Sequence, residues 1–360
     1  MPSNVAPAQV EPRSAAIKRR LKTVPMIIVL AFVVTGLIVP LALGAIAIDA
    51  WIGIVKRRPS AYLRSLMFGW AYLIADIVGL TFLTITWFTS LGGRNQLHLQ
   101  RTAFWAQQNW AGFMMGAAKF LFRLNIEVHG QEQAEPGPYI EVIRHSSIVD
   151  NVLSAIAISG PLGIDLRYVI KKELLGDPVF DVCGKRLWNH FLDRDSGDPK
   201  EIEAIRRLAS DMGRKDGALI YPEGTRVSEK RRLKALKAIA RNRPERAERF
   251  KNLKHCLPPR HGGLLALLDA APDVDLVLFL HVGLEGIRGI QDALSGGLNG
   301  RRTVIQIIRV ARAQVGNGEA AAEWLDTTWL AVDDWVDAGI KAIASGVPVP
   351  QFVVPSTVTA

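Results

Sequence analysis

A histidine and an aspartate follow the strand candidate Tyr139–Ile143 closely enough to form a catalytic pair. His145 and Asp150 stand five positions apart in the segment Arg144-His145-Ser146-Ser147-Ile148-Val149-Asp150. On a straight helix with 3.6 residues per turn, two such side chains point ~140° away from each other. They can meet only if His145 lies in a turn before the helix and the chain bends back. The carboxylate could then hold one ring nitrogen and leave the other free to act as a base.

A second motif follows another strand candidate, Ala218–Tyr221. It reads Pro222-Glu223-Gly224-Thr225-Arg226. Glycine lets the backbone approach a ligand, and the guanidinium of Arg226 has the fork that suits a phosphate. A His-x4-Asp spacing alone often arises by chance, and a solvated turn is the alternative interpretation. Two motifs that each follow a strand together favour one site at the edge of a sheet.

The rest of the chain from about Arg94 onward has the pattern of a folded α/β domain. Short apolar runs predict strands at Ile126–His129, Tyr139–Ile143, Leu166–Ile170, Ala218–Tyr221, Val274–Val282 and Thr303–Val310. Helices are predicted at Phe104–Arg123, Ile148–Ile158, Lys200–Arg214, Glu229–Arg241, Gly263–Ala270 and Ala320–Ile343. Strands that alternate with helices predict a mostly parallel sheet covered by helices. Such sheets bind ligands outside the carboxyl ends of their strands.

Several common catalytic motifs are missing from the 360 residues. The chain has no Gly-x-Ser-x-Gly elbow, Walker loop, Gly-x-Gly-x-x-Gly after a strand, or His-Glu-x-x-His. These absences disfavour serine hydrolases, P-loop NTPases, dinucleotide enzymes and zincins. The two cysteines, Cys183 and Cys256, lie too far apart and are too few for a disulfide scaffold or a cysteine-rich zinc site. No metal-ligand set is evident.

Most of the remaining histidines have no carboxylate at a suggestive spacing. His190 is expected to pack beside the site, and His261 to shape a loop. The others show no partner spacing; they are His98, His129, His255 and His281.

The N-terminal part predicts a membrane-embedded helical hairpin, and the mean hydropathy of +0.16 is high for a soluble protein. Val24–Ile48 holds 25 uncharged positions, and a spanning helix needs ~20. A second apolar stretch between Arg64 and Arg94 is broken only by Asp76. Cations before an apolar run also begin signal peptides, but this run is too long for one, so an anchor is favoured.

The sequence leaves open whether the hairpin spans the bilayer or dips into one leaflet. Lys and Arg number five before the first apolar run and two after the second, against four in the connector. This count gives only a small preference for a cytoplasmic active site at the cell membrane. A hairpin in one leaflet would let all these cations meet anionic headgroups. Asp49 and Asp76 are expected at a helix end or paired across the hairpin, because facing lipid would be costly.

Five blocks, in order, give the chain a family resemblance. They are His145–Asp150, Lys172-Glu173-Leu174, Phe191-Leu192-Asp193-Arg194, Tyr221–Arg226 and Leu257–Gly263. Together they resemble the glycerolipid acyltransferases, the lysophosphatidic acid acyltransferase superfamily, over Ile126–Val310. Arg144 departs from the asparagine that often precedes the histidine. The 32 residues between Arg226 and Pro259, and the Pro-Arg pair that follows, resemble the lysocardiolipin and lysophosphatidylinositol acyltransferase branch.

The resemblance implies transfer of an acyl chain from acyl-CoA or acyl carrier protein to the hydroxyl of 1-acylglycerol-3-phosphate, giving phosphatidic acid. It implies no cofactor beyond this co-substrate. His145 would be the general base and Asp150 its orienting partner. Substrate binding is implied for Glu223, Gly224, Thr225, Arg226, Arg194, Lys172 and Arg260, with the acceptor phosphate near Arg194 and Arg226. Because the alcohol itself attacks, Ser147 is expected to be a turn residue or helix cap.

Other functions stay open at this point. The acceptor could be another lysophospholipid or glycerol-3-phosphate, or the protein could bind membrane lipids without catalysis. The intact His145, Asp150 and Glu223–Arg226 argue against a relic site. The missing serine elbow disfavours a membrane esterase.

The chain is predicted to have four parts. Residues 1–22 are a basic disordered tail, 23–93 the hairpin, 94–345 the acyltransferase domain and 346–360 a flexible tail.

A basic insert lies within the predicted domain, and the whole chain carries a formal charge of +10. The insert holds ten cations in 22 residues: Lys230, Arg231, Arg232, Lys234, Lys237, Arg241, Arg243, Arg246, Arg249 and Lys251. An exposed charged helix, a helix on an anionic phospholipid membrane and a contact to the phosphates of CoA are the alternatives. Nucleic acid binding is disfavoured because no aromatic platform accompanies the charge.

Overall fold

The computed structural model describes residues 11–147, 149–192 and 200–356, which fall into two compact units. Unit 1 comprises Met1–Leu124, Arg167–Gly197 and Gly289–Gly300, and unit 2 comprises Asn125–Leu166, Asp198–Arg288 and Arg301–Ala360. Each unit thus combines segments that are far apart in the sequence. The predicted boundary at residues 93 and 94 does not separate the two units.

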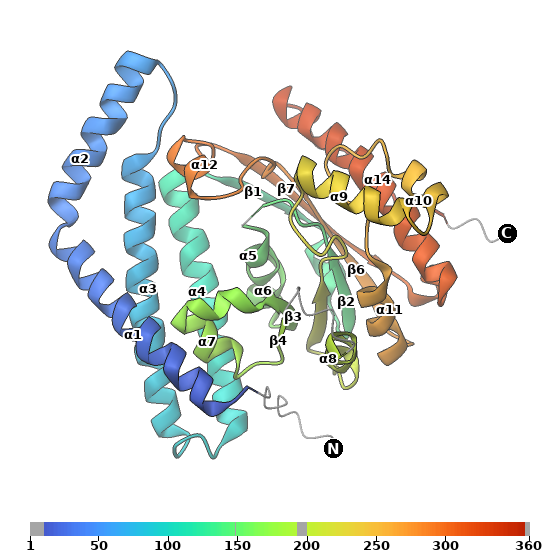
Figure 1. The fold of residues 1–360 in the computed structure, drawn as a ribbon, viewed down its shortest axis with the longest axis horizontal. Helices are drawn as coiled ribbons and strands as arrows, with labels where there is room; N and C mark the ends of the chain where they lie inside the picture. Colours follow the sequence, from blue (N-terminus) through green and yellow to red (C-terminus); the bar gives the residue numbers. More distant parts are fainter. Residues whose placement is uncertain (1–10, 148, 193–199, 357–360) are drawn as a thin grey trace. The chain divides into compact units, whose positions relative to one another are not determined.

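Unit 1 is mainly helical (Figure 1). Its helices are α1 (Arg13–Gly36), α2 (Ile38–Trp51), the π-helix η1 (Ile52–Lys56), α3 (Tyr62–Thr89), α4 (Gln96–Phe122), the 3₁₀ helix η4 (Lys172–Gly176), α7 (Pro178–Gly184) and α12 (Ile290–Leu294). Strand β3 (Asp165–Lys171) continues into this unit, where it pairs in parallel with the short strand β4 (His190–Leu192). The sequence did not predict β4, since three residues give too short a pattern to detect.

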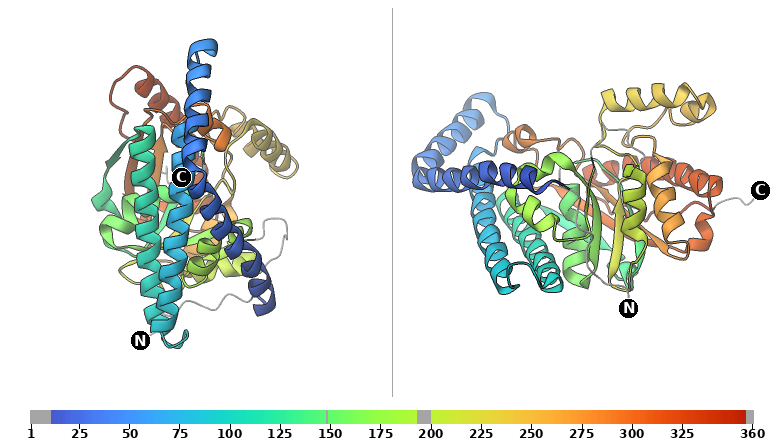
Figure 2. Two further views of the ribbon diagram at one scale, coloured as in Figure 1. Left: turned by 90° about the vertical axis from the view of Figure 1, so that its left-hand side faces the viewer. Right: turned by 60° about the horizontal axis from the view of Figure 1, so that its bottom comes forward.

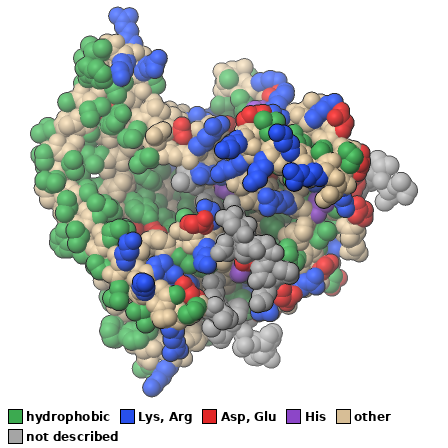
Figure 3. Space-filling model, viewed as in Figure 1, with side chains coloured by type: hydrophobic (Ala, Val, Ile, Leu, Met, Phe, Trp, Pro, Cys, Tyr) green, Lys and Arg blue, Asp and Glu red, His purple; other side chains and the backbone are tan. Residues whose placement is uncertain are grey.

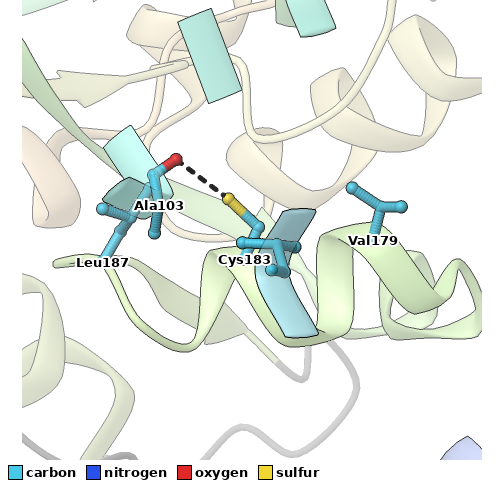
Figure 4. Packing of buried hydrophobic residues seen from close by; sticks show 5 residues of the cluster. Ala103, Val179, Cys183 and Leu187 are labelled. Atoms are coloured by element: carbon cyan, nitrogen blue, oxygen red, sulfur yellow. Dashed lines mark hydrogen bonds between the residues drawn. The ribbon is translucent and has the colours of Figure 1, made fainter. Parts of the chain in front are cut away.

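Apolar side chains hold the long helices of unit 1 together. Helices α3 and α4 lie side by side in both views of Figure 2. Ala103 of α4 packs with Val179 and Cys183 of α7, and the thiol of Cys183 donates to the carbonyl of Ala103 over 3.2 Å (Figure 4). Small residues at these contacts let the helix backbones approach closely, as is common between helices in membranes.

The two aspartates of the apolar segments have polar partners. Asp49 accepts hydrogen bonds from the hydroxyl of Ser60 and from the amides of Tyr62 and Leu63, over 2.6 to 3.0 Å. It therefore satisfies free amides in the first turn of α3, across the hairpin from its own helix. Asp76 accepts from the indole of Trp110 in α4 over 3.1 Å. The expectation for Asp49 is confirmed, whereas the partner of Asp76 lies outside the hairpin.

Two helices are long and apolar enough to cross a membrane: Ile38–Lys56 and Tyr62–Thr89. They support the predicted pair of apolar helices. The first apolar run is nevertheless not one helix, because α1 ends at Gly36 and α2 begins at Ile38. Residues 13–22 are helical, so the prediction of a disordered tail over 1–22 is wrong there. The basic residues 13–22 and the apolar residues that follow belong to one continuous helix, α1. The change in composition near residue 22 therefore does not mark a change in structure.

Unit 2 is built around a sheet. Its strands are β1 (Asn125–His129), β2 (Tyr139–Ile143), β5 (Asp216–Ile220), β6 (Asp275–Val282) and β7 (Arg302–Val310), together with the start of β3. Its helices are η2 (Gln131–Ala134), α5 (Asp150–Ser154), η3 (Ala155–Ser159), α6 (Gly160–Leu162), α8 (Lys200–Ala209), α9 (Glu229–Ala240), α10 (Pro244–Arg249), α11 (His261–Ala270), α13 (Arg312–Val315) and α14 (Glu319–Ala344). All six predicted strands are present.

The sheet of unit 2 is mostly parallel, as predicted. Apart from the start of β3, its strands follow the order β1-β7-β6-β2-β5. Strands β6 and β7 pair antiparallel to each other, and the other pairings between these strands are parallel. Every residue of β2 is buried, which fits a strand with parallel partners on both sides and helices over its faces. Helices α8 and α11 contact each other and β5, and α14 contacts β6.

The prediction of a flexible tail over 346–360 is wrong for 346–352, and residues 357–360 lie outside the described residues. The amide of Phe352 donates to the side chain of Gln306 in β7 over 2.7 Å. The indole of Trp335 donates to the carbonyl of Pro350 over 2.8 Å, and Phe352 itself is buried. These bonds hold an extended segment of unit 2 that forms no helix or strand.

Candidate active site

Three parallel strands of unit 2 end at one edge of the sheet, and the predicted motifs follow two of them. His145 comes after β2 and Tyr221–Arg226 after β5, while the loop from Gly283 to Arg288 follows β6. The amide of Val227 donates to the carbonyl of His145 over 3.1 Å. The rings of His145 and Tyr221 lie 4.3 Å apart, centre to centre. The two motifs thus meet, at the edge where open parallel sheets bind ligands.

His145 and Asp150 form the predicted pair. Nδ1 of His145 lies 3.2 Å from Oδ2 of Asp150. Helix α5 begins at Asp150, so His145 lies in the turn before it, as the spacing required. Oδ2 also accepts from the amides of Ser146 and Ser147, over 2.6 and 2.7 Å. The backbone itself thus wraps around the carboxylate.

Ser147 supports this turn. Its hydroxyl donates to Oδ1 of Asp150 over 2.6 Å and accepts from the amide of Val149 over 3.1 Å. Both bonds are local, and they agree with the expected turn role for Ser147. Ile148, between Ser147 and Val149, lies outside the described residues.

Asp150 stays ionised although it is fully buried. Burial alone would raise its pKa, but the electrostatic interaction with His281 and the hydrogen bonds from His145 and Ser147 hold the pKa below its usual value. An ionised Asp150 accepts the Nδ1 proton of His145 and fixes that tautomer. Among the described residues, Nε2 of His145 has no hydrogen-bond partner. This is the geometry of an oriented general base.

The Glu223–Arg226 motif splits into an inward half and an outward half. The carboxyl group of Glu223 is buried and accepts from the indole of Trp329 in α14 over 3.2 Å. Burial raises the pKa of Glu223 to about 8, against the opposing effects of Arg144 and Trp329. Glu223 is therefore largely protonated at neutral pH and anchors the motif to α14. A contact between Glu223 and substrate stays a prediction.

Gly224 and Arg260 lie against each other. Gly224 has a φ of +67°, and a Cβ there would stand 3.3 Å from the Arg260 side chain. The amide of Arg260 donates to the carbonyl of Pro222 over 2.8 Å, while its side chain is exposed. The structure thus brings the proline block to the glycine, which places an exposed guanidinium beside the motif.

Arg226 reaches the loop after β6. Its Nη1 donates to the carbonyl of Arg288 over 2.7 Å, and Thr225 beside it is partly exposed. Their substrate contacts stay predictions. Lys172 is exposed and belongs to unit 1, so its part in the site also stays a prediction. Arg194 lies outside the described residues.

Sequence reasoning missed a buried ion pair next to the motif. Arg144 is fully buried, and its Nη1 donates to Glu285 over 2.8 Å and to the carbonyl of His281 over 2.7 Å. Burial would raise the pKa of Glu285, but the charge and hydrogen bond of Arg144 lower it. In the sequence, Arg144 follows one predicted strand and Glu285 follows another. The two could be paired only by knowing that β2 and β6 are neighbours in the sheet.

His255 and His281, which show no partner spacing in the sequence, both have partners in the structure. His281 lies in β6 with Nε2 3.1 Å from the carbonyl of Arg144 and 3.5 Å from Oδ1 of Asp150. Nε2 of His255 lies 3.1 Å from Asp337 in α14. These partners are far away in the sequence, so spacing could not reveal them.

The part of the chain that the structure describes contains no group of three or more His, Cys, Asp or Glu side chains that could hold a metal ion. The polar groups gathered at the sheet edge are a histidine–aspartate pair, arginines and backbone amides. Such groups can move a proton and bind an anion.

Comparison with known proteins agrees with this chemistry. Residues 125–251 match the family model for Acyltransferase. The match covers about a third of the chain, and it agrees with the glycerolipid acyltransferase superfamily that the sequence blocks resemble. Membership in the lysocardiolipin and lysophosphatidylinositol branch stays a prediction.

One solved structure that resembles the chain is the 1-acyl-sn-glycerophosphate (LPA) acyltransferase PlsC from Thermotoga maritima. It shares 14% sequence identity with this chain, with a TM-score of 0.47, over 78% of this chain and 98% of that one. No curated protein matches the chain.

Proposed function

We propose that the protein is a membrane-bound O-acyltransferase that moves a fatty acyl chain from acyl-CoA or acyl carrier protein to 1-acylglycerol-3-phosphate, giving phosphatidic acid. The observation that carries the proposal is the His145–Asp150 pair, with one ring nitrogen held by the buried carboxylate. The pair lies beside the Glu223–Arg226 motif of the superfamily. Two apolar helices of membrane-spanning length support the membrane location.

The reaction needs one base and no protein nucleophile. Nε2 of His145 takes the proton of the acceptor hydroxyl as its oxygen attacks the thioester carbonyl carbon. The tetrahedral intermediate then collapses, the carbon–sulfur bond breaks, and the proton passes to the leaving thiolate. Asp150 stabilises the positive ring of His145 during the transfer. A general base of this kind contributes ~10²–10⁴-fold in rate.

The acceptor phosphate has cationic candidates at the sheet edge. Arg226 ends the Glu223–Arg226 motif, and the Arg260 side chain lies against Gly224. A glycine lets backbone amides approach a phosphate closely. Guanidinium groups bind phosphate through paired hydrogen bonds. Arg194 and Lys172 are further candidates from the family resemblance. The proposed acceptor is therefore an anionic lysophospholipid with an exposed phosphate.

An acceptor panel tests the function. The protein in detergent receives radiolabelled acyl-CoA or acyl carrier protein with lysophosphatidate, lysophosphatidylinositol, lysocardiolipin or glycerol-3-phosphate. The highest kcat/KM is expected with lysophosphatidate, and His145→Ala should remove it. A higher value with another lysophospholipid would move the protein to that acceptor. Acceptor binding without turnover by the wild type would favour a non-catalytic lipid-binding protein.

We propose that α9 of unit 2 lies on the surface of an anionic membrane, where its cations contact lipid headgroups. Among the ten cations of the basic insert, five form ion pairs, including Arg246 with Asp326 and Arg249 with Glu323 of α14. Three lysines of α9 are exposed and form no ion pair with any described residue: Lys230, Lys234 and Lys237. Figure 3 shows Lys and Arg gathered where α9 and α10 lie.

We expect the stimulation of activity by anionic lipid to depend on the cations of α9 and not on those in and after α10. Each cation near an anionic bilayer contributes ~1 kcal/mol. Replacing Lys230, Lys234 and Lys237 by Gln should therefore reduce the stimulation of activity by phosphatidylglycerol in proteoliposomes. The matched control replaces the ion-paired Arg249 and Lys251 by Gln and should leave the stimulation unchanged. Equal stimulation in both variants would reject this surface.

The proposed location is the cell membrane with the active site on the cytoplasmic side. Cys183 and Cys256 are buried, so a single engineered cysteine can report topology. Arg58 lies exposed in the connector between η1 and α3. Labelling of Arg58→Cys only from the cytoplasmic side would exclude two full spans. Labelling only from outside would support them.

A further inference from the structure

His281 is a buried imidazole that the proposed reaction does not use. It lies in β6, next to β2, and its side chain is completely buried. Nε2 stands 3.1 Å from the carbonyl oxygen of Arg144 and 3.5 Å from Oδ1 of Asp150. A carbonyl oxygen can only accept a hydrogen bond, so Nε2 carries a proton. That proton points toward the turn that holds the His145–Asp150 pair.

The two oxygens of Asp150 are held from different directions. Oδ2 accepts from His145 and from the amides of Ser146 and Ser147. Oδ1 accepts from the hydroxyl of Ser147 and faces His281. Every contact except the one with His281 comes from within the turn itself. His281 is therefore the described side chain that connects the carboxylate to the rigid centre of the sheet.

The surroundings of His281 favour the neutral ring. Burial lowers the pKa of His281, while the nearby Asp150 opposes this shift. The other charged groups that face it are Arg144, which disfavours a positive ring, and Glu285, which favours one. Nδ1 has no hydrogen-bond partner among the described residues. A neutral ring can lie 3.5 Å from Asp150 without cancelling the negative charge that His145 needs when it accepts a proton.

We propose that His281 is a positioning residue for acyl transfer. Its Nε2 donates to the carbonyl of Arg144, directly after β2, and stands 3.5 Å from Oδ1 of Asp150, so it holds both ends of the turn that aims His145 against β6. The inference rests on the proposed function only for its effect on kcat, because these contacts exist without substrate. Loss of this donor would remove the hydrogen bond to the Arg144 carbonyl and the contact with Asp150. A small displacement of a catalytic group can cost ~10²-fold in rate.

Three substitutions separate positioning from mere packing. His281→Gln can place an amide N–H near the position of Nε2, whereas the shorter His281→Asn cannot reach it. His281→Leu removes the donor and stays apolar. We expect kcat to fall ~10–100-fold in the Asn and Leu variants while both KM values change less than about threefold. His281→Gln should recover to within about threefold of the wild type. Equal kcat in the Gln and Asn variants, at equal melting temperature, would overturn the proposal.

A readout independent of activity is the Nδ1 proton of His145. In ¹⁵N-histidine-labelled protein, its resonance is assigned by its absence in His145→Ala. We expect a slowly exchanging signal in the wild type and in His281→Gln, and rapid exchange in His281→Asn. An unchanged signal in a folded His281→Asn variant would reject the positioning role. If the wild type turned over no acceptor, the proposed function would fail, while this signal would still decide the role of His281.

Discussion

Among the described residues of unit 2, the buried Asp150 and Asp326 each contact the ring of a histidine, and only Asp150 forms part of the candidate active site. Asp150 contacts His145 at the edge of the sheet, over 3.2 Å. Asp326 of α14 contacts His261 at the start of α11, over 2.7 Å. Hydrogen bonds lower the pKa of both carboxyl groups, against the effect of burial. Burial and a short His–Asp contact therefore do not distinguish a catalytic pair.

The position of the arginine distinguishes them. Arg246 donates to both oxygens of Asp326, over 2.6 and 2.8 Å, and lies 3.0 Å from His261. It thus cancels the negative charge that His261 faces. Arg144 instead turns away from Asp150 and pairs with Glu285 over 2.8 Å. Asp150 keeps its charge for His145, whereas Asp326 joins three structural elements.

The largest expected difference is in catalysis. His145→Ala should lower kcat by at least ~10²–10⁴-fold, because it removes the proposed base. His261→Ala should keep the kcat per folded molecule within a few-fold of the wild type. Steady-state kinetics with lysophosphatidate measures both.

Asp150→Asn should resemble His145→Ala, because the amide cannot stabilise a positive ring. A well-folded His145→Ala variant with near-normal turnover would remove the base assignment. Loss of kcat in His261→Ala without a change in melting temperature would erase the contrast between the two pairs.

The second expected difference is in stability. Asp326→Asn should lower the free energy of unfolding by about 3 kcal/mol, because it leaves the largely buried Arg246 without its anion. Activity per folded molecule should be retained. Denaturant unfolding followed by tryptophan fluorescence measures the change, with the exposed pair variant Asp269→Asn as control. A loss no larger than that of the control would mean that water replaces the anion.

A smaller kinetic effect is expected at Arg226. Lys keeps the charge but loses the fork, so Arg226→Lys should raise the KM for lysophosphatidate by roughly 10- to 150-fold. The KM for the thioester should change much less. Arg249→Lys, in an ion pair with α14, is the matched control.

Two outcomes would assign Arg226 differently. If the KM for the acyl donor alone rises, Arg226 belongs to the thioester site. If kcat falls while the acceptor KM stays constant, the contact forms mainly in the transition state.

The smallest effect concerns Glu141, a buried carboxyl group that forms no ion pair with any residue that the structure describes. Burial raises its pKa to about 8, despite a hydrogen bond from Ser154. The folded state therefore holds a proton that the unfolded state releases above about pH 4.5. This contribution to stability is complete at low pH and is lost as the pH rises toward about 8.

Glu141→Gln should make the melting temperature less dependent on pH between about 5 and 8, by a few degrees. Thermal unfolding across this range measures the slope. Activity at neutral pH should be unchanged, since Glu141 lies within β2 and away from the strand end. A slope equal to that of the wild type would show that another group controls this pH dependence.

The strand segments of unit 2 and the local turn that joins His145 to Asp150 could be predicted from the sequence alone. Each predicted strand is a short apolar run, and whether such a run can form a strand is decided mainly by residues that are close together in the sequence. The His145–Asp150 contact was also predictable, because a five-residue spacing can close only in a turn before a helix. The family blocks indicated the acyltransferase class in the same way. The break between α1 and α2 falls at Leu37, directly after Gly36, and a glycine in an apolar run is a signal for such a kink.

Only the tertiary structure decided which distant groups surround the pair. Parallel β2 and β6 are neighbours although about 130 residues separate them, so Arg144 meets Glu285 and His281 meets Asp150. It also decided that Glu223 faces Trp329 rather than solvent. Local patterns record which residues can form a strand or a turn, but strand order depends on how whole faces bury one another. The electrostatics of the site follow from that order, because charge acts through space and not along the chain.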